Sequence, residues 1–180
     1  MYLDIRLCYK NRSMPGGSEV KSGAVHVRRS EDRRVLFEGY AGTLGTRIST
    51  ISIFGIRYFE KNYGGILSSM SKNSRILEVG PGGASFTQYL LYKGFKDITV
   101  CEIADDNIQS LNAFFGDRIR VIHQDVMDYL ESSSDTFDVI YAAQFIEHLN
   151  HDDFMTFLGH CHRSLEEDGS IILETINCAN

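Results

Sequence analysis

The sequence predicts an α/β fold, a parallel sheet of about five strands with helices on both faces, preceded by an N-terminal helical cap. Along residues 73–180, short apolar runs typical of buried strands alternate with stretches whose apolar residues recur at helical spacing. Strands separated by helices form parallel sheets with right-handed crossovers. The first run leads directly into Gly80-Pro81-Gly82-Gly83 and then a helix. Such a unit brings backbone amides and a helix N-terminus to one sheet edge, where nucleotide-like ligands bind.

Each element follows from a local pattern. The expected strands occupy residues 76–79, 97–102, 118–123, 137–142 and 170–174. The expected helices lie around residues 86–91, at 104–115 and at 152–165, the last ended by residues 166–169. Residues 36–72 look helical in pieces, with an interruption at Gly64-Gly65. We therefore divide the chain into an N-terminal extension and helical cap, residues 1–72, and a ligand-binding domain, residues 73–180.

Length and charge limit the classes of function. The chain has 180 residues, about one domain, and a formal net charge of −6. Residues 1–50 carry nine Lys and Arg against five Asp and Glu, whereas residues 51–180 carry nine against nineteen. Nucleic-acid binding depends on neutralising phosphates, which an acidic main domain does not favour. We expect no nucleic-acid partner.

The cysteines and apolar runs bear on the compartment. Cys8, Cys101, Cys161 and Cys178 show no C-x-x-C spacing, so neither a zinc knuckle nor a redox pair is indicated. Cysteines scattered in this way are typical of a reducing cytoplasm. No apolar run approaches the roughly 20 residues of a membrane span, and the N-terminus lacks the apolar core of a signal peptide. We expect a cytoplasmic protein without a membrane partner.

Acidic and amide side chains follow four successive expected strands. In order they are Glu78, Glu102, Asp125 and the segment from Gln144 to His148. The carboxyl ends of parallel strands meet at one edge of a sheet, so we expect one site. Glu102 lies 22 residues after Gly80, near the spacing at which an acid accepts hydrogen bonds from a ribose. Two alternatives stay open: Glu102 as an exposed strand-end acid, and Asp125 as the N-cap of a helix over residues 126–130.

Several motifs in register resemble one family. They are Glu-Val-Gly-Pro-Gly-Gly-Ala at residues 78–84, Glu102, Gln124-Asp125-Val126, and Phe137-Asp-Val-Ile with Ile146-Glu-His-Leu. Together they resemble a class I S-adenosylmethionine-dependent methyltransferase of the small-molecule type, from about residue 56 onward. The resemblance implies a Rossmann-like fold, S-adenosylmethionine as cofactor, and methyl transfer to an oxygen or nitrogen of a small-molecule acceptor.

The resemblance also implies roles for single residues. The implied cofactor-binding residues are Glu78, Gly80, Pro81, Gly82, Glu102, Ile103, Asp125, Val126 and Gln144. Gly80 and Gly82 pass close to the methionyl part of the cofactor, and Glu78 holds its amine. Glu102 binds the ribose hydroxyls, and Asp125 accepts from the adenine amino group.

The segment after the fourth strand carries the catalytic expectation. By the resemblance, Gln144 lies beside the transferred methyl group. For a hydroxyl acceptor, a general base adds about 10²–10⁴-fold, and His148 is the expected base, with packing against Leu149 as the alternative. The segment is similar to the E-x-x-E-H site of quinone-pathway O-methyltransferases, in which a divalent cation assists. Gln144 replaces the first acid, so we expect no metal.

The chain departs from the family pattern in two places. Ala84 stands at the third small position of the glycine motif. The family sheet normally has seven strands, and Asn180 follows soon after the fifth expected strand. We therefore expect residues 171–173 on an unprotected edge strand, which would be either an aggregation liability or the surface of a homodimer. Residues 174–177, Glu-Thr-Ile-Asn, are similar to the E-x-P-N of methyltransferases acting on sugars and small secondary metabolites.

Two other functions stay open. A non-catalytic S-adenosylmethionine-binding or scaffold domain is the first, because acceptor sites in the family often draw on the missing strands. A nicotinamide-dependent oxidoreductase is the second. The G-x-G-x-x-G pattern of such enzymes requires glycine where this chain has Ser85, and Asp125 also argues against this class.

Overall fold

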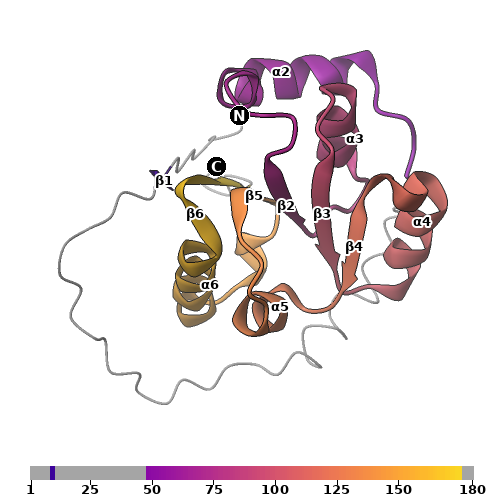
Figure 1. Ribbon diagram of the computed structural model, residues 1–180. Coiled ribbons are helices and arrows are strands. Elements are labelled where there is room, and N and C mark those ends of the chain that lie inside the picture. The colour runs from indigo at the N-terminus through magenta and orange to yellow at the C-terminus, as the bar shows by residue number, and fades with distance from the viewer. Residues whose placement is uncertain (1–8, 11–47, 176–180) are drawn as a thin grey trace, which may run out of the picture.

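The computed structural model describes Tyr9–Lys10 and residues 48–175, which form a six-stranded sheet with helices on both faces (Figure 1). The strands are β1 (Tyr9–Lys10), β2 (Arg75–Val79), β3 (Asp97–Glu102), β4 (Arg120–His123), β5 (Phe137–Ala143) and β6 (Leu165–Glu174). Their order in the sheet is β1-β6-β5-β2-β3-β4, and all neighbours are parallel except β1 and β6. The predicted parallel sheet of about five strands is confirmed.

The helices alternate with the strands along the chain. They are α2 (Ile53–Ser68), α3 (Ser85–Tyr92), α4 (Asp105–Phe115), α5 (Val126–Ser132) and α6 (His151–Ser164), with 3-10 turns η1 (Gly116–Arg118) and η2 (Ile146–His148). No helix within the described residues is long and apolar enough to cross a membrane. Apart from Tyr9–Lys10, the expectations for residues 1–47 lie outside the described part of the chain.

Side chains that alternate along each strand build two cores. Ile76 of β2 and Ile172 of β6 lie in a cluster with residues of α2, α3 and α4. Leu77 and Leu173, one position further along each strand, lie in a second cluster with residues of α5 and α6. The molecule therefore has three layers, with the sheet between two sets of helices.

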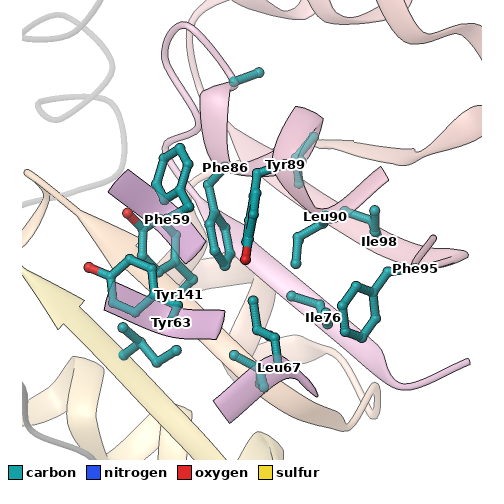
Figure 2. Packing of buried hydrophobic residues seen from close by; sticks show 14 of the residues in the cluster. Phe59, Tyr63, Leu67, Ile76, Phe86, Tyr89, Leu90, Phe95, Ile98 and Tyr141 are labelled. Carbon is teal, nitrogen blue, oxygen red and sulfur yellow. The ribbon is translucent and has the colours of Figure 1, made fainter. Parts of the chain in front are cut away.

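Helix α2 differs from its sequence prediction. The expected break at Gly64-Gly65 is wrong, because one helix runs from Ile53 to Ser68 through both glycines. Phe59, Tyr63 and Leu67 of this helix are buried in the first core, and Figure 2 shows Tyr63 beside Tyr141 of β5. This burial outweighs the cost of about 1 kcal/mol for a glycine inside a helix. The division at residue 72 stays a prediction, although α2 shares a core with the sheet.

Strand β6 differs in length and in its neighbour. Residues 166–169, expected to end the preceding helix, belong to the strand as a bulge: Leu165 pairs with Phe137, and the next pair is Ser170 with Val139. The expected unprotected edge is wrong at Ile171, which pairs with Tyr9, and Lys10 pairs with Ser170 just before it. The N-terminal strand β1 covers the edge at these positions. Similarly, β4 begins at Arg120, because residues 116–118 form η1.

Candidate functional site

A cavity of about 380 Å³ lies where β2, β5 and β6 reach their carboxyl ends, under α2 and the start of α3. This volume is in the range of small-molecule sites. Its lining residues are Tyr58, Phe59, Glu78, Val79, Gly80, Pro81, Gly82, Gly83, Ser85, Phe86, Tyr141, Ala143, Gln144 and Glu174. Five predicted cofactor-binding residues are among them: Glu78, Gly80, Pro81, Gly82 and Gln144. The other four, Glu102, Ile103, Asp125 and Val126, lie at the ends of β3 and β4 instead.

The turn between β2 and α3 requires glycine because of its backbone. Gly80 has φ +58° and Gly82 has φ +50°, in the left-handed region that a side chain disfavours. A Cβ added to Gly82 would meet no protein atom within 4 Å, so a longer side chain there would extend into the cavity. Ala84, with φ +53°, shares this conformation. The amides are not all bare as expected, since those of Gly80 and Ala84 donate to the carbonyls of Cys101 and Pro81.

Glu78 is a buried acid on the cavity wall. Glu78 is 3% exposed, and its carboxyl group accepts a hydrogen bond from the hydroxyl of Thr87 on α3. Burial raises the pKa of Glu78 to about 8, although the hydrogen bonds from Thr87 lower it. Near neutral pH this acid is therefore mostly protonated in the ligand-free protein.

Glu174 ends β6 on the opposite side of the cavity, surrounded by tyrosine hydroxyls. Tyr58 donates to Oε1 at 2.7 Å, and Tyr63 and Tyr141 donate to Oε2 at 2.5 Å and 3.1 Å. Burial, followed by the charge of Glu174, raises the pKa of Tyr141 far above its usual range, and Glu78 adds to this effect. The Tyr141 ring therefore lies in the field of both carboxyl groups.

Aromatic rings form the wall between these two acids. Phe86 stacks on Tyr141 with ring centroids 3.9 Å apart, and Phe59 lies 5.4 Å from Phe86 (Figure 2). Tyr63 packs edge-on against Tyr141 at 5.7 Å. The cavity wall therefore combines two carboxyl groups with the aromatic side chains of Tyr58, Phe59, Phe86 and Tyr141.

Glu102 is held by the loop that follows it. Oε1 accepts from the amides of Ile103 and Ala104 at 2.7 and 2.9 Å, and Oε2 accepts from Asn107 Nδ2 at 3.0 Å. The residue is 7% exposed, so the alternative of an exposed strand-end acid is wrong. These bonds fix the carboxylate at the start of α4.

Asp125 caps the next helix. Its Oδ1 accepts from the Met127 amide at 2.8 Å, and it is the N-cap of α5. The capping alternative is therefore confirmed. Capping and cofactor binding are compatible, because a carboxylate has two oxygens with about four acceptor positions. Gln124, one residue earlier, ties the two strand ends together by donating its amide to the Glu102 carbonyl at 3.0 Å.

Gln144 and His148 differ in their relation to the cavity. Gln144 lines it and has φ +51°, which is unusual for a residue with a side chain. Its amide donates to the Glu174 carbonyl at 2.7 Å, which joins the ends of β5 and β6. His148 ends η2, is exposed, and does not line the cavity. Its role as general base stays a prediction.

The ionisable carboxyl groups of the cavity face no basic partner among the described lining residues. Among its described lining residues, Glu78 and Glu174 are acidic and none is Lys, Arg or His. Within the described residues, no three His, Cys, Asp or Glu side chains come together as a metal site would require. The described wall of the cavity thus carries acidic groups and no basic group.

The sequence did not reveal the residues that donate hydrogen bonds to Glu78 and Glu174. Thr87 and Tyr141 gave no signal of their own, since one is a helix residue and the other a strand residue. Tyr63 is 1% exposed, and its hydroxyl donates to Glu174. Glu174 was recognised only through its similarity to a family motif.

Comparison with known proteins gives a family. A family model described as a methyltransferase domain matches residues 56–179. The bovine mitochondrial ubiquinone biosynthesis O-methyltransferase is 30% identical over 109 residues, which are 57% of this chain and 29% of that protein. The human N-terminal Xaa-Pro-Lys N-methyltransferase 1 is 26% identical over 140 residues, which are 76% of this chain and 62% of that protein. The chain thus spans less than two thirds of either relative.

A solved structure shares the fold. It is 1,6-didemethyltoxoflavin-N1-methyltransferase from Burkholderia thailandensis, with bound 1,6-didemethyltoxoflavin and S-adenosylhomocysteine. It has a TM-score of 0.58 and 18% identity, and the match covers 96% of this chain and 71% of that one. The Rossmann-like fold predicted from the motifs is confirmed.

Proposed function

The chain belongs to the methyltransferase-domain family, and we propose that it transfers a methyl group from S-adenosylmethionine to a small-molecule acceptor. The observation that carries the proposal is the cavity at the turn between β2 and α3, which Glu78, Gly82 and Gln144 line. Glu102 and Asp125 continue the same sheet edge. This edge is where an open parallel sheet binds a nucleotide-like ligand.

Two regions of the site would bind the two parts of the cofactor. The methionyl part would lie in the cavity along Gly80, Pro81 and Gly82, with Glu78 toward its amine and Gln144 toward the methyl group. The adenosine part would lie over the ends of β3 and β4. There Glu102 would face the ribose, beside Ile103, and Asp125 the adenine, beside Val126.

Methyl transfer needs little more than placement. The acceptor atom attacks the methyl carbon in line with the departing sulfur, so holding it about 3 Å away supplies much of the rate enhancement. The walls of the cavity are built on β5, β6 and α2, and these packed elements give the fixed positions that such placement requires. The aromatic rings would also favour the cationic sulfonium of the cofactor.

The relatives leave the acceptor atom open. The bovine relative is named as an O-methyltransferase and the human relative as an N-methyltransferase. Both names are consistent with methyl transfer from S-adenosylmethionine, and the solved structure with S-adenosylhomocysteine supports the same cofactor. His148 stays the predicted base for a hydroxyl acceptor. A cytoplasmic location, a homodimer and the lack of a nucleic-acid partner also stay predictions.

Calorimetric titration tests the cofactor. The wild-type protein and a Glu102→Ala variant are titrated with S-adenosylmethionine, S-adenosylhomocysteine and NAD. We expect micromolar binding of the two sulfur compounds, none of NAD, and weaker binding by the variant. A folded wild type that binds neither sulfur compound contradicts the proposal. Binding without transfer to any acceptor in a broad screen would favour the non-catalytic alternative.

A further inference from the structure

The cavity is lined by a carboxylate, that of Glu174, which no part of the proposed cofactor site uses. Glu174 lines the cavity at the end of β6 and is half-buried. Glu78, beside the glycine turn, is already assigned to the amine of the cofactor. A second carboxyl group across the same cavity therefore needs a separate explanation.

The surroundings of Glu174 hold it in place. Hydroxyls of Tyr58 and Tyr63 from α2 and of Tyr141 from β5 donate to its two oxygens. Among the described residues these donors fill three of about four acceptor positions of a carboxylate. The group is thus fixed on the cavity wall with acceptor capacity left for a ligand.

The chemistry of this wall matches one class of acceptor. A carboxylate on a cavity wall built largely from aromatic side chains attracts alkylammonium groups through its charge, and the aromatic wall accommodates their carbon skeleton. The described lining residues include no Lys, Arg or His that would pair with a carboxylate or phenolate acceptor. An anionic acceptor would meet like charge at Glu174.

Building on the proposed function, we infer that the methyl acceptor is a basic amine, and that Glu174 binds its ammonium group and takes up its proton. The ammonium group gives one proton to a carboxylate oxygen of Glu174. The nitrogen lone pair then forms a bond to the methyl carbon while the carbon–sulfur bond breaks and sulfur keeps the electron pair. The positive charge passes from sulfur to nitrogen, and S-adenosylhomocysteine leaves.

The test measures which head group the cavity prefers. The probes are phenethylamine, phenethyl alcohol and 3-phenylpropionate, which carry an ammonium, a hydroxyl and a carboxylate on similar aromatic skeletons. Each is titrated near pH 7 into the full chain saturated with S-adenosylhomocysteine, and binding is followed by ligand-observed NMR. We expect the ammonium to bind at least about tenfold more tightly than the alcohol, and the carboxylate not to bind.

A charge-matched pair of variants assigns the preference to one residue. Glu174→Gln keeps a hydrogen-bond acceptor for the tyrosines but removes the charge. Glu167→Gln removes a charge from an exposed position on the same strand, outside the cavity. We expect the preference for ammonium to disappear in Glu174→Gln and to persist in Glu167→Gln. If the hydrogen bonds of Glu174 only stabilised the packing of α2 on the sheet, Glu174→Gln would lower the melting temperature and leave the preference for ammonium unchanged. That result would overturn the inference.

The outcomes separate this inference from the proposed function. Equal or tighter binding of the alcohol or carboxylate by wild type, or no probe binding, overturns the amine inference even if Glu174→Gln does not fold. Failure to bind S-adenosylhomocysteine contradicts the proposed function. In that case the same probes are titrated into the ligand-free protein, where the preference for ammonium still tests the Glu174 site.

Discussion

The two halves of the carboxyl edge of the sheet hold their acids differently. At the ends of β2, β5 and β6, here called the cavity half, Glu78 and Glu174 accept hydrogen bonds from hydroxyl groups and line an open space. At the ends of β3 and β4, the β3–β4 half, Glu102 accepts from backbone amides of the loop before α4, and Asp125 accepts from a backbone amide of α5. The first arrangement leaves room for a ligand between elements, whereas the second builds a fixed rim from the local chain.

This difference separates two physical roles of an acid. In the β3–β4 half, removing a carboxylate also removes hydrogen bonds that hold the loop before α4 or cap α5, so binding and stability are coupled there. In the cavity half, Glu78 is buried against side chains, and its protonation state becomes part of the binding equilibrium. The variants below are chosen to separate these roles.

The largest effect is expected from Gly82→Val. Gly82 has φ +50° and faces the cavity, so valine would both strain the turn and fill the space of the methionyl group. We expect S-adenosylmethionine binding to weaken more than about 100-fold, with a stability loss of about 1–2 kcal/mol. Gly94→Val is the matched control, because Gly94 has φ +86° in an exposed turn after α3, away from the cavity. Equal loss of binding in both variants would contradict the placement of the methionyl group against Gly82.

The second effect depends on pH and concerns Glu78. Its pKa rises from 4.5 in the unfolded chain to about 8 in the folded protein, so between these values the folded state keeps a proton that the unfolded state loses. The free energy of unfolding should therefore fall as pH rises from about 4.5 to about 8, by up to about 1.4 kcal/mol per pH unit. Comparing denaturant midpoints of wild type and Glu78→Gln across this window isolates the contribution. Identical pH slopes would contradict it.

The same proton should appear in binding. If the ionised form of Glu78 pairs with the cofactor amine, S-adenosylmethionine affinity should rise by up to about tenfold per pH unit as pH approaches 8. The binding enthalpy near pH 7 should then vary with the ionisation enthalpy of the buffer, because a proton is released. Glu78→Gln should show neither effect.

The third effect separates capping from recognition at Asp125. Asparagine is as good an N-cap as aspartate, so Asp125→Asn should leave the melting temperature nearly unchanged. We expect S-adenosylmethionine affinity to fall by about tenfold, since the amide replaces an acceptor for the adenine amino group. Asp125→Ala should lose in addition about 1 kcal/mol of stability. Unchanged affinity in Asp125→Asn would leave Asp125 with a capping role alone.

The smallest effect is expected at Gln144, whose φ is +51°. Glycine adopts this conformation without the steric cost of a side chain, so Gln144→Gly should change stability by less than about 1 kcal/mol, toward stabilisation. Cofactor binding should weaken a few-fold because the amide side chain lines the cavity. Thermal melting and calorimetry on the same samples measure both. A destabilised variant would show that the Gln144 side chain, rather than its backbone, supports the end of β5.

The strand ends could be predicted because their signals are local. Residues 97–102 form β3 as expected, since apolar runs followed by an acid depend on a few neighbouring residues. The break at Gly64-Gly65 was wrong because core packing of Tyr63 and Leu67 outweighs helix propensity. Propensity alone gives no measure of that packing.

Contacts between distant residues could not be predicted. Tyr58 and Glu174 are 116 positions apart, yet share a hydrogen bond of 2.7 Å, and only the crossing of α2 over the ends of β5 and β6 brings them together. The pairing of Tyr9 with Ile171 depends on tertiary structure in the same way. The raised pKa of Glu78 also follows from burial, which the residue order alone does not reveal.

A crystal structure with S-adenosylhomocysteine tests the central claim most directly. The account predicts the homocysteine part in the cavity half, against Gly82 with its amine toward Glu78. It predicts the ribose at Glu102 and the adenine at Asp125, in the β3–β4 half. A ligand bound elsewhere, or with its adenine in the cavity beside Glu174, would contradict both the division of the site and the acceptor position inferred from it.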